Sequence, residues 1–170
     1  MTIYSIIGQS LIGWLFADFL TGLLHWVGDS EKLSKTRVIK LLSGFNTSHH
    51  SDPLAITRQS FVARNSSQWA IVSVISLVWF FLAGFSFVWL ACTVGGMITG
   101  QVHSWAHAPK TAPRLVRLLQ EIGVFQSPKH HAAHHRPPHS VRFCVLTDWL
   151  NPVLDTLRFW PRLERLLPYK

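Results

Sequence analysis

Hydrophobic residues gather in two long stretches of the chain, separated by polar segments. The first stretch, residues 3–27, is long enough to cross about 30 Å of hydrocarbon as a helix, at about 1.5 Å per residue. The second, residues 68–104, has no charged residue and is too long for a single straight crossing. A break at residues 83–86 divides it into a helical hairpin. We therefore predict membrane-spanning helices over residues 3–27, 69–83 and 85–106.

The middle span, residues 69–83, is short for a full crossing, so we expect it to be tilted or partly re-entrant. Polar sequence fills the loop 28–68 and the tail 108–170. In the tail, residues 113–125 place leucines on one face and charged residues elsewhere, which favours a helix in the membrane interface. Ser127 and Pro128 are typical of a helix start, and Pro137-Pro138 of a stop. Residues 151–167, interrupted by Pro161, predict a second interfacial segment.

This pattern predicts an all-α membrane protein of one domain, residues 1–170, with about three transmembrane helices. Basic residues occur only in two blocks, residues 32–64 and 110–170, for a formal net charge of +8. The positive-inside rule then puts the loop and the tail in the cytoplasm and the N-terminus on the far side. Such long uncharged stretches between basic blocks argue against a nucleic-acid-binding surface. The N-terminus lacks a basic region and a cleavage site, so we expect a retained span.

Histidine is the main candidate for chemistry. All ten histidines lie at or beyond the predicted cytoplasmic ends of the apolar segments. His103 and His107 are spaced i, i+4, and His131 is followed by His134 and His135 at i+3 and i+4, so paired imidazoles can converge on one ion. We therefore expect a histidine-rich cytoplasmic cap with a metal centre assembled from several segments. The two cysteines, Cys92 and Cys144, form no metal or disulfide motif.

The small number of carboxylates limits the kinds of metal site that the chain can form. There is no HExxH zinc-protease motif, and the three glutamates are not placed as in soluble di-iron bundles. A carboxylate-poor, histidine-rich site open to a bilayer suits iron that activates O2 against a lipid chain, although imidazole also suits zinc, copper or nickel. Asp18, the only charged residue within the first span, would share a helix face with Gly22, His25 and Asp29, which makes it a functional candidate.

A joint pattern over residues 15–167 is highly specific. It comprises residues 17–19, 22, 25–26, 29, 49–53, 56–58, 61, 65, 101–107, 119–120, 130–135, 138–139, 143–144, 149–151, 154–155 and 163–164. In these positions the chain resembles the lipid desaturase family, which includes plasmanylethanolamine desaturase and the plastid desaturase acting on phosphatidylglycerol. The plastid members lack the His-Asp-Pro-like loop and have Gln and Tyr at the positions of His130 and His139. The resemblance therefore favours the plasmanyl type.

The resemblance implies a pair of iron ions bound by eight histidines, with zinc as an alternative occupant: His25, His49, His50, His103, His107, His131, His134 and His135. Five further residues are expected to be ligands or to support the ligands: Asp18, Asp29, Asp52, His130 and His139. Four arginines are candidates for holding the substrate phosphate: Arg114, Arg117, Arg136 and Arg142.

The implied reaction is the O2-dependent conversion of the 1-O-alkyl chain of an ether phospholipid to a vinyl ether. No GxGxxG nucleotide motif is present, so electrons would come from a separate donor of the cytochrome b5 or ferredoxin type. Unlike the animal members, the chain has no extra N-terminal span and has a shorter hairpin, so we expect a bacterial inner-membrane protein, or an endoplasmic reticulum protein if eukaryotic.

Two alternatives remain open from the residues. The first is desaturation or hydroxylation of a phospholipid acyl chain on the same scaffold. The second is a non-catalytic membrane protein that binds or carries zinc. The pattern does not specify an oligomeric state.

Overall fold

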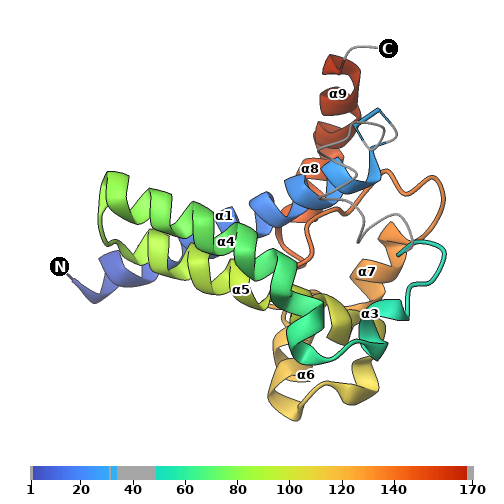
Figure 1. Cartoon of the computed structure of the whole chain (residues 1–170), viewed down its shortest axis with the longest axis horizontal. Helices are drawn as coiled ribbons and strands as arrows, with labels where there is room; N and C mark the ends of the chain where they lie inside the picture. Colours follow the sequence, from blue (N-terminus) through green and yellow to red (C-terminus); the bar gives the residue numbers. More distant parts are fainter. Residues whose placement is uncertain (1, 31, 34–48, 168–170) are drawn as a thin grey trace.

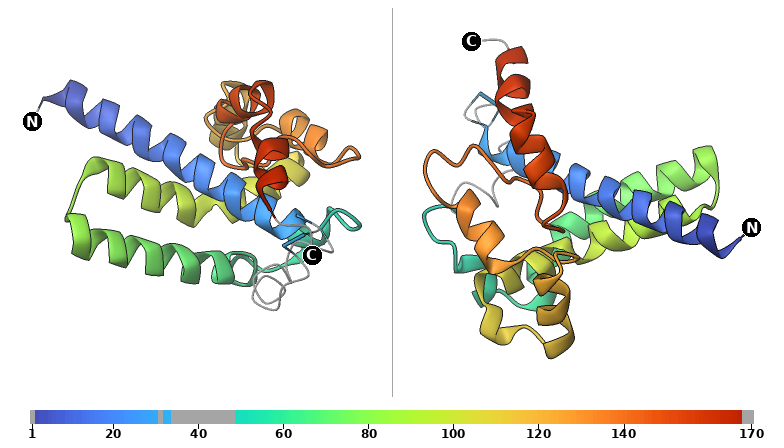
Figure 2. Two further views of the ribbon diagram at one scale, coloured as in Figure 1. Left: turned by 90° about the horizontal axis from the view of Figure 1, so that it is seen from above. Right: turned by 180° about the vertical axis from the view of Figure 1, so that it is seen from behind.

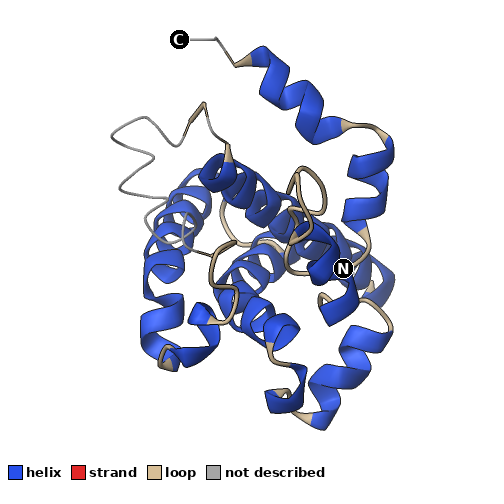
Figure 3. Ribbon diagram, turned by 90° about the vertical axis from the view of Figure 1, so that its right-hand side faces the viewer, coloured by secondary structure: helices blue, strands red, loops and turns tan. Residues whose placement is uncertain are grey.

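The computed structural model describes residues 2–30, 32–33 and 49–167. Within these ranges every regular element is a helix (Figure 3), which confirms the predicted all-α class for the described part of the chain. The long helices are α1 (Ile3–Asp29), α4 (Phe61–Ala83) and α5 (Phe87–His107). The shorter ones are α3 (Ala55–Arg58), α6 (Arg114–Glu121), α7 (Pro128–His134), α8 (Leu150–Thr156) and α9 (Phe159–Leu166), with a 3-10 turn at Pro109–Thr111. Residues 31 and 34–48 of the predicted loop lie outside the described residues.

The three long helices lie side by side, and the short helices gather at the end of this bundle far from the N-terminus (Figures 1 and 2). Both α1 and α4 pack against α5, which lies between them. Where α1 meets α5, a Cβ on Gly95 would lie 2.8 Å from the Ala17 Cβ, so only glycine permits this approach. Small residues therefore set the spacing of the two helices, as is common in membrane bundles.

The predicted break at residues 83–86 is confirmed. Gly84 ends α4 with φ 71°, a conformation that glycine adopts readily, and the Ser86 hydroxyl caps α5 by accepting from the Trp89 N–H at 3.1 Å. The helix α4, however, begins at Phe61 rather than near residue 69. Its 23 residues span about 35 Å, so this arm is not short for a crossing.

Partners on neighbouring segments explain why the polar start of α4 is helical. The Ser60 hydroxyl caps the helix, and the Arg64 guanidinium donates to the Gln101 Oε1 of α5 at 2.6 Å. Asn65 is fully buried. By length and composition α1 and α4 can each cross a membrane, with mean hydropathies of 1.4 and 1.7. A third crossing by α5 stays a prediction.

One tail helix, α6, has the apolar exposed face expected of a helix in the membrane interface. On α6, Leu115, Leu118 and Ile122 are exposed while Val116 and Gln120 are buried, so an apolar face points away from the protein. The prediction that Pro161 interrupts the last segment is wrong. The chain turns between α8 and α9 at Arg158, which has φ 49°, and Pro161 lies in the first turn of α9, where its missing N–H leaves no hydrogen bond unmade.

A hydrophobic cluster joins the tail to the first helix. Trp26 of α1 packs with Phe143, Cys144, Leu154 and Trp160. This contact brings residues more than a hundred positions apart together at the end of the bundle where the histidines lie, and it fixes the segment 141–147 against α1.

Candidate metal centre

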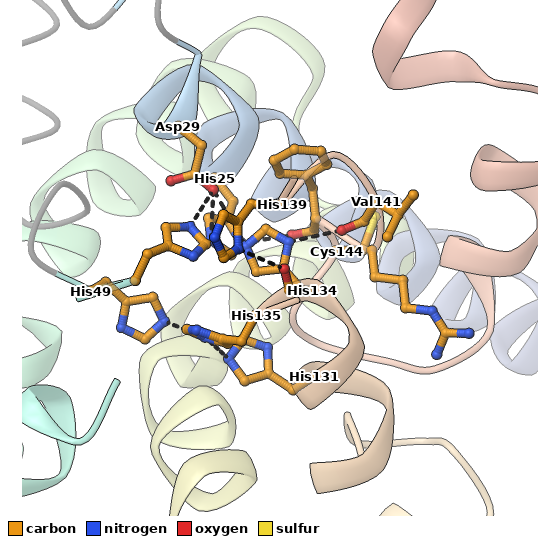
Figure 4. A network of polar contacts seen from close by, with 12 residues as sticks. His25, Asp29, His49, His131, His134, His135, His139, Val141 and Cys144 are labelled. Carbon is orange, nitrogen blue, oxygen red and sulfur yellow. Dashed lines mark hydrogen bonds and ion pairs between the residues drawn. The ribbon is translucent and has the colours of Figure 1, made fainter. Parts of the chain in front are cut away.

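Histidines from four segments converge at this end of the bundle. Figure 4 shows those of α1, of the turn before α3 and of the α7 region. The histidines come from the last turns of α1 and α5, from the turn before α3, and from α7. Their ligand atoms form two groups, within each of which all atoms lie within 4.8 Å of one another. One group is His49, His103, His107, His131 and His135, and the other is His25, Asp29, His50 and His134. The structure thus brings together all eight histidines proposed as ligands, with Asp29, one of the five residues expected to be ligands or to support them.

Four Nε2 atoms of the first group form a closed ring of contacts. The order is His49, His103, His131 and His135, and each of the four neighbouring Nε2 atoms lies 3.0 Å from the next. The Nε2 of His107 lies 3.2 Å from those of His103 and His49 and 2.8 Å from that of His131. Five imidazole nitrogens from three segments therefore lie within contact distance of one another.

This donor set fits a metal ion better than it fits hydrogen bonding. A neutral imidazole carries one N–H, so the inward nitrogens cannot supply a proton to every one of these close contacts. The usual bond length from an imidazole nitrogen to a divalent transition metal is about 2.1 Å, so two nitrogens 3.0 Å apart are close enough to bind the same ion. Neighbouring ligands at this spacing subtend about 90° at such an ion rather than the wider angle of a tetrahedral zinc site.

The second group is built around a carboxylate. The Oδ2 of Asp29 lies 2.9 Å from the Nε2 of His50, 3.3 Å from that of His134 and 3.4 Å from that of His25. The His25 and His134 rings are 4.3 Å apart. One carboxylate oxygen and three imidazole nitrogens therefore face one another at the end of α1, a set that suits a divalent transition metal.

Backbone carbonyls orient two of these rings. The Nδ1 of His25 lies 3.0 Å from the Phe143 carbonyl oxygen, and the Nδ1 of His134 lies 2.8 Å from that of Val141. A carbonyl only accepts, so Nδ1 carries the proton in both rings and Nε2 presents its lone pair to the site. Such outer hydrogen bonds are usual for histidines that bind metals.

The environment keeps three of the histidines outside the long helices neutral. Burial, followed by neighbouring imidazoles, lowers the pKa of His49 to about 2 and that of His135 to about 3. The same causes hold the pKa of His131 well below its ordinary value. Neutral imidazole is the form that binds a metal, so these side chains are ready to act as ligands near pH 7.

Four of the five further residues expected near the site lie outside both groups. Asp52 is half-exposed and forms an ion pair with Arg58. His130 lies 3.0 Å from the Asn151 amide nitrogen and 3.1 Å from an Arg142 nitrogen, so it joins α7 to the tail.

Asp18 lies deeper in α1. Its carboxylate accepts hydrogen bonds from the backbone N–H groups of Leu146 and Thr147, at 2.9 and 3.0 Å, and from the Thr147 hydroxyl at 2.6 Å. It anchors the segment that carries the Val141 and Phe143 carbonyls. His139 is closer to the site, because its ring lies 4.3 Å from that of His50 and its Nδ1 lies 3.2 Å from the His134 carbonyl.

The four arginines lie outside the two ligand groups, and Arg142 contacts His130, which is not a member of either group. Arg114 and Arg136 are exposed, and Arg117 donates to the Ala112 carbonyl. Arg142 is half-buried, and its backbone N–H donates to Asp155. A phosphate-binding role for any of them stays a prediction.

An apolar groove, which the sequence analysis did not predict, leads away from the histidines. It has a volume of about 430 Å³ and lies between α1 and α4, with α5 as its floor. His25 and His103, one from each ligand group, line its inner end. The α5 residues that line it are small or polar next to the histidines, such as Gly96, Thr99 and Gly100.

The chain was compared with known proteins. The lipid desaturase domain model matches residues 14–170. Plasmanylethanolamine desaturase of Myxococcus xanthus is 34% identical over 94% of this chain and 59% of that protein, and plasmanylethanolamine desaturase 1 of Mus musculus is 33% identical over 91% and 62%. Fatty acid desaturase 4, chloroplastic, of Arabidopsis thaliana is 31% identical over 93% and 50%. The chain thus spans about three fifths of the length of the first two relatives. No solved structure matches.

Proposed function

Because the chain belongs to the lipid desaturase family, we propose that it is a multi-pass membrane di-iron enzyme that converts the 1-O-alkyl chain of an ether phospholipid to a vinyl ether. The proposed topology has three crossings by α1, α4 and α5, with the histidines on the cytoplasmic side. Relatives named plasmanylethanolamine desaturase, at 33–34% identity, support the choice of an ether lipid.

One observation carries the proposal: both ligand groups meet the inner end of an apolar groove. His25 belongs to the carboxylate-containing group, His103 belongs to the five-histidine group, and both line the groove. A lipid chain in the groove would present its head-group end to both groups at once. An ion-binding site with only a structural role would not need such a channel.

We assign the following roles to the residues of the chain. The five histidines would hold one iron, and His25, Asp29, His50 and His134 the other. The Phe143 and Val141 carbonyls keep the Nδ1 protons of His25 and His134, so that both Nε2 lone pairs stay directed at the site. The apolar walls of the groove exclude water and hold the chain with its first two carbons next to the ligands.

Two iron ions, with O2 and two electrons, would supply the oxidising power needed to remove hydrogen from saturated carbons. The first two carbons of the alkyl chain, counted from the ether oxygen, would each lose one hydrogen. With two further protons and the two electrons, O2 would leave as two molecules of water. A separate electron donor of the cytochrome b5 or ferredoxin type is part of the proposal.

Acyl-chain desaturation is the second candidate, because chloroplastic fatty acid desaturase 4 is 31% identical over nearly the same span. The two reactions differ in product. A vinyl ether is cleaved by mild acid, whereas an acyl double bond is not. Lipid mass spectrometry before and after acid treatment of cells that express the protein therefore separates the two.

The decisive experiment is His134→Ala in cells supplied with alkyl phospholipid. His134 is fully buried and its Nε2 faces the carboxylate-containing group, so we expect at least a hundredfold loss of vinyl-ether product and a fall in bound iron from about two ions per chain to about one. The matched control is Asp52→Asn, which changes a polar residue outside both groups and should keep product and iron. Product retained in His134→Ala, or a wild-type protein that holds only zinc and consumes no O2, would refute the proposal.

A further inference from the structure

The groove is open along one side and closed at its deep end. Leu24 of α1 and Ile75 of α4 form its two rims, and each is 43% exposed, so the opening faces what would be the lipid. Along α4 the lining runs from Ser67, near the histidines, to Trp79. These 12 residue steps correspond to about 18 Å, close to the thickness of one leaflet of a bilayer, which is about half of 30 Å.

An aromatic contact closes the deep end. Trp79 is the lining residue of α4 farthest from the histidines, and it is half-buried between neighbours that are exposed. Its ring meets that of Phe16 on α1 edge to face, with centroids 5.8 Å apart. The two helices are therefore bridged at this level, beside Ala17 and Cys92, which are the deepest lining residues of α1 and α5.

We propose that Trp79, braced by Phe16, is the end stop that limits the length of the lipid chain the protein accepts. The inference rests on the proposed function, because the reacting end of the chain is taken to lie at the histidines. With one end of the chain held there, its far end must lie near Trp79. A chain longer than the groove would have to displace the indole or leave the groove into the bilayer.

Two substitutions should move the stop in opposite directions. Trp79→Ala removes the barrier and should raise the ratio of longer to shorter chains bound by about tenfold, the scale on which an apolar pocket distinguishes chain length. Ile75→Trp adds an indole about one helical turn nearer the histidines and should favour shorter chains to a similar extent. Phe81→Ala is the matched control, since Phe81 is an aromatic residue of the same helix that is 81% exposed and does not line the groove.

The measurement does not require turnover. Purified full-length protein in detergent is mixed with 1-O-alkyl phosphatidylethanolamines of graded chain length, and the bound lipids are identified by mass spectrometry. The vinyl-ether products of the same mixture are then measured in membranes. Opposite shifts in Trp79→Ala and Ile75→Trp, with Phe81→Ala like the wild type, support the end stop.

The outcomes separate the two proposals. If wild-type protein forms vinyl ether but neither variant changes the chain lengths bound or converted, the end stop is overturned and the function stands. If the bound chain lengths shift as expected while no protein forms vinyl ether, the end stop stands and the proposed function falls. Should Trp79→Ala fail to fold, Ile75→Trp alone decides, since an unchanged profile in that variant overturns the inference.

Discussion

At the scale of single residues, Asp18 connects the first helix to the tail. Its carboxylate takes three hydrogen bonds from Leu146 and Thr147, and it is completely buried. The same tail segment supplies the Phe143 carbonyl to His25. Asp18 therefore affects the candidate metal centre through the backbone it holds, without being one of the nine ligand candidates.

Asp18→Ala should destabilise the protein by about 1–3 kcal/mol and lower bound iron, because two buried backbone N–H groups lose their acceptor. Thr147→Val keeps both backbone donors to Asp18 and removes only the hydrogen bonds of the hydroxyl, to Asp18 and from the Trp149 N–H, so it should have a smaller effect of the same sign. Thermal unfolding and iron content of the detergent-purified variants test this order. Equal iron content in Asp18→Ala and wild type would show that the segment is held in place by other contacts.

The histidine pairs could be predicted from sequence because helical spacing acts within one element. His103 and His107 share a face of α5, as i, i+4 spacing requires, and His131 and His135 share a face of α7. The roles of the aspartates could not be assigned in this way. Asp29 and Asp52 both lie a few residues from histidines in sequence, yet only Asp29 faces three imidazoles. The arrangement of α1, α3 and α7 in space decides which of the two carboxylates lies in a ligand group.

At the scale of the element, α7 is short but carries most of the tail ligands. Its start is fixed by the Ser127 hydroxyl, which accepts from the His130 N–H at 3.2 Å, while the Ser127 N–H donates to Asp148 at 2.9 Å. Pro128 follows at the first helical position, as the sequence predicts. A helix of seven residues depends strongly on such a cap, because few internal hydrogen bonds hold it.

Ser127→Ala should weaken α7 by about 1 kcal/mol and reduce iron affinity, because His131 and His134 then spend less time in the ligand geometry. Ser60→Ala removes the equivalent cap of α4 and serves as the control. It should lower thermal stability to a comparable degree but leave iron affinity unchanged. Iron titration of both variants makes the comparison, and equal affinities would contradict a special role for this cap.

Element boundaries were the weaker part of the sequence prediction, for a physical reason. Residues 61–68 look like loop by hydropathy, but Arg64 donates to Gln101 of α5 and to the Ile56 carbonyl of α3, so the helix extends through them. Pro161 looks like a helix break, but the chain has already turned at Arg158. In both cases contacts or turns outside the local pattern decide the boundary.

At the scale of the whole molecule, polar chemistry is confined to one end of an apolar bundle. The candidate ligands and the short tail helices lie there, and the N-terminus lies at the other end (Figure 1). The basic residues of the chain fall in the segments 32–64 and 110–170, and the described parts of these segments that carry α3, α6 and α7 lie at the histidine end. The distribution of charge and the positions of the histidines can both be read from the sequence. Both predict a topology in which the metal centre lies on the cytoplasmic side.

The proposed three crossings place Tyr4 and Lys110 on opposite sides of the membrane. Both are exposed, and the native Cys92 and Cys144 are buried, so single cysteines introduced at these positions can be labelled selectively. In intact cells a membrane-impermeant maleimide should label Tyr4→Cys, and Lys110→Cys should react only after the cells are opened. Labelling of both in intact cells, or of neither, would indicate an even number of crossings.

The distribution of the ligands also sets an order of events during synthesis. Each ligand group draws on α7, through His131 and His135 in one case and His134 in the other, while α1 emerges first and already carries His25 and Asp29. Neither set is complete until the ribosome has added residue 134 or 135. A nascent chain that stalls earlier would insert its apolar helices but would lack a complete set of metal ligands. The proposed iron ions must therefore be loaded late, after the helices are in the membrane.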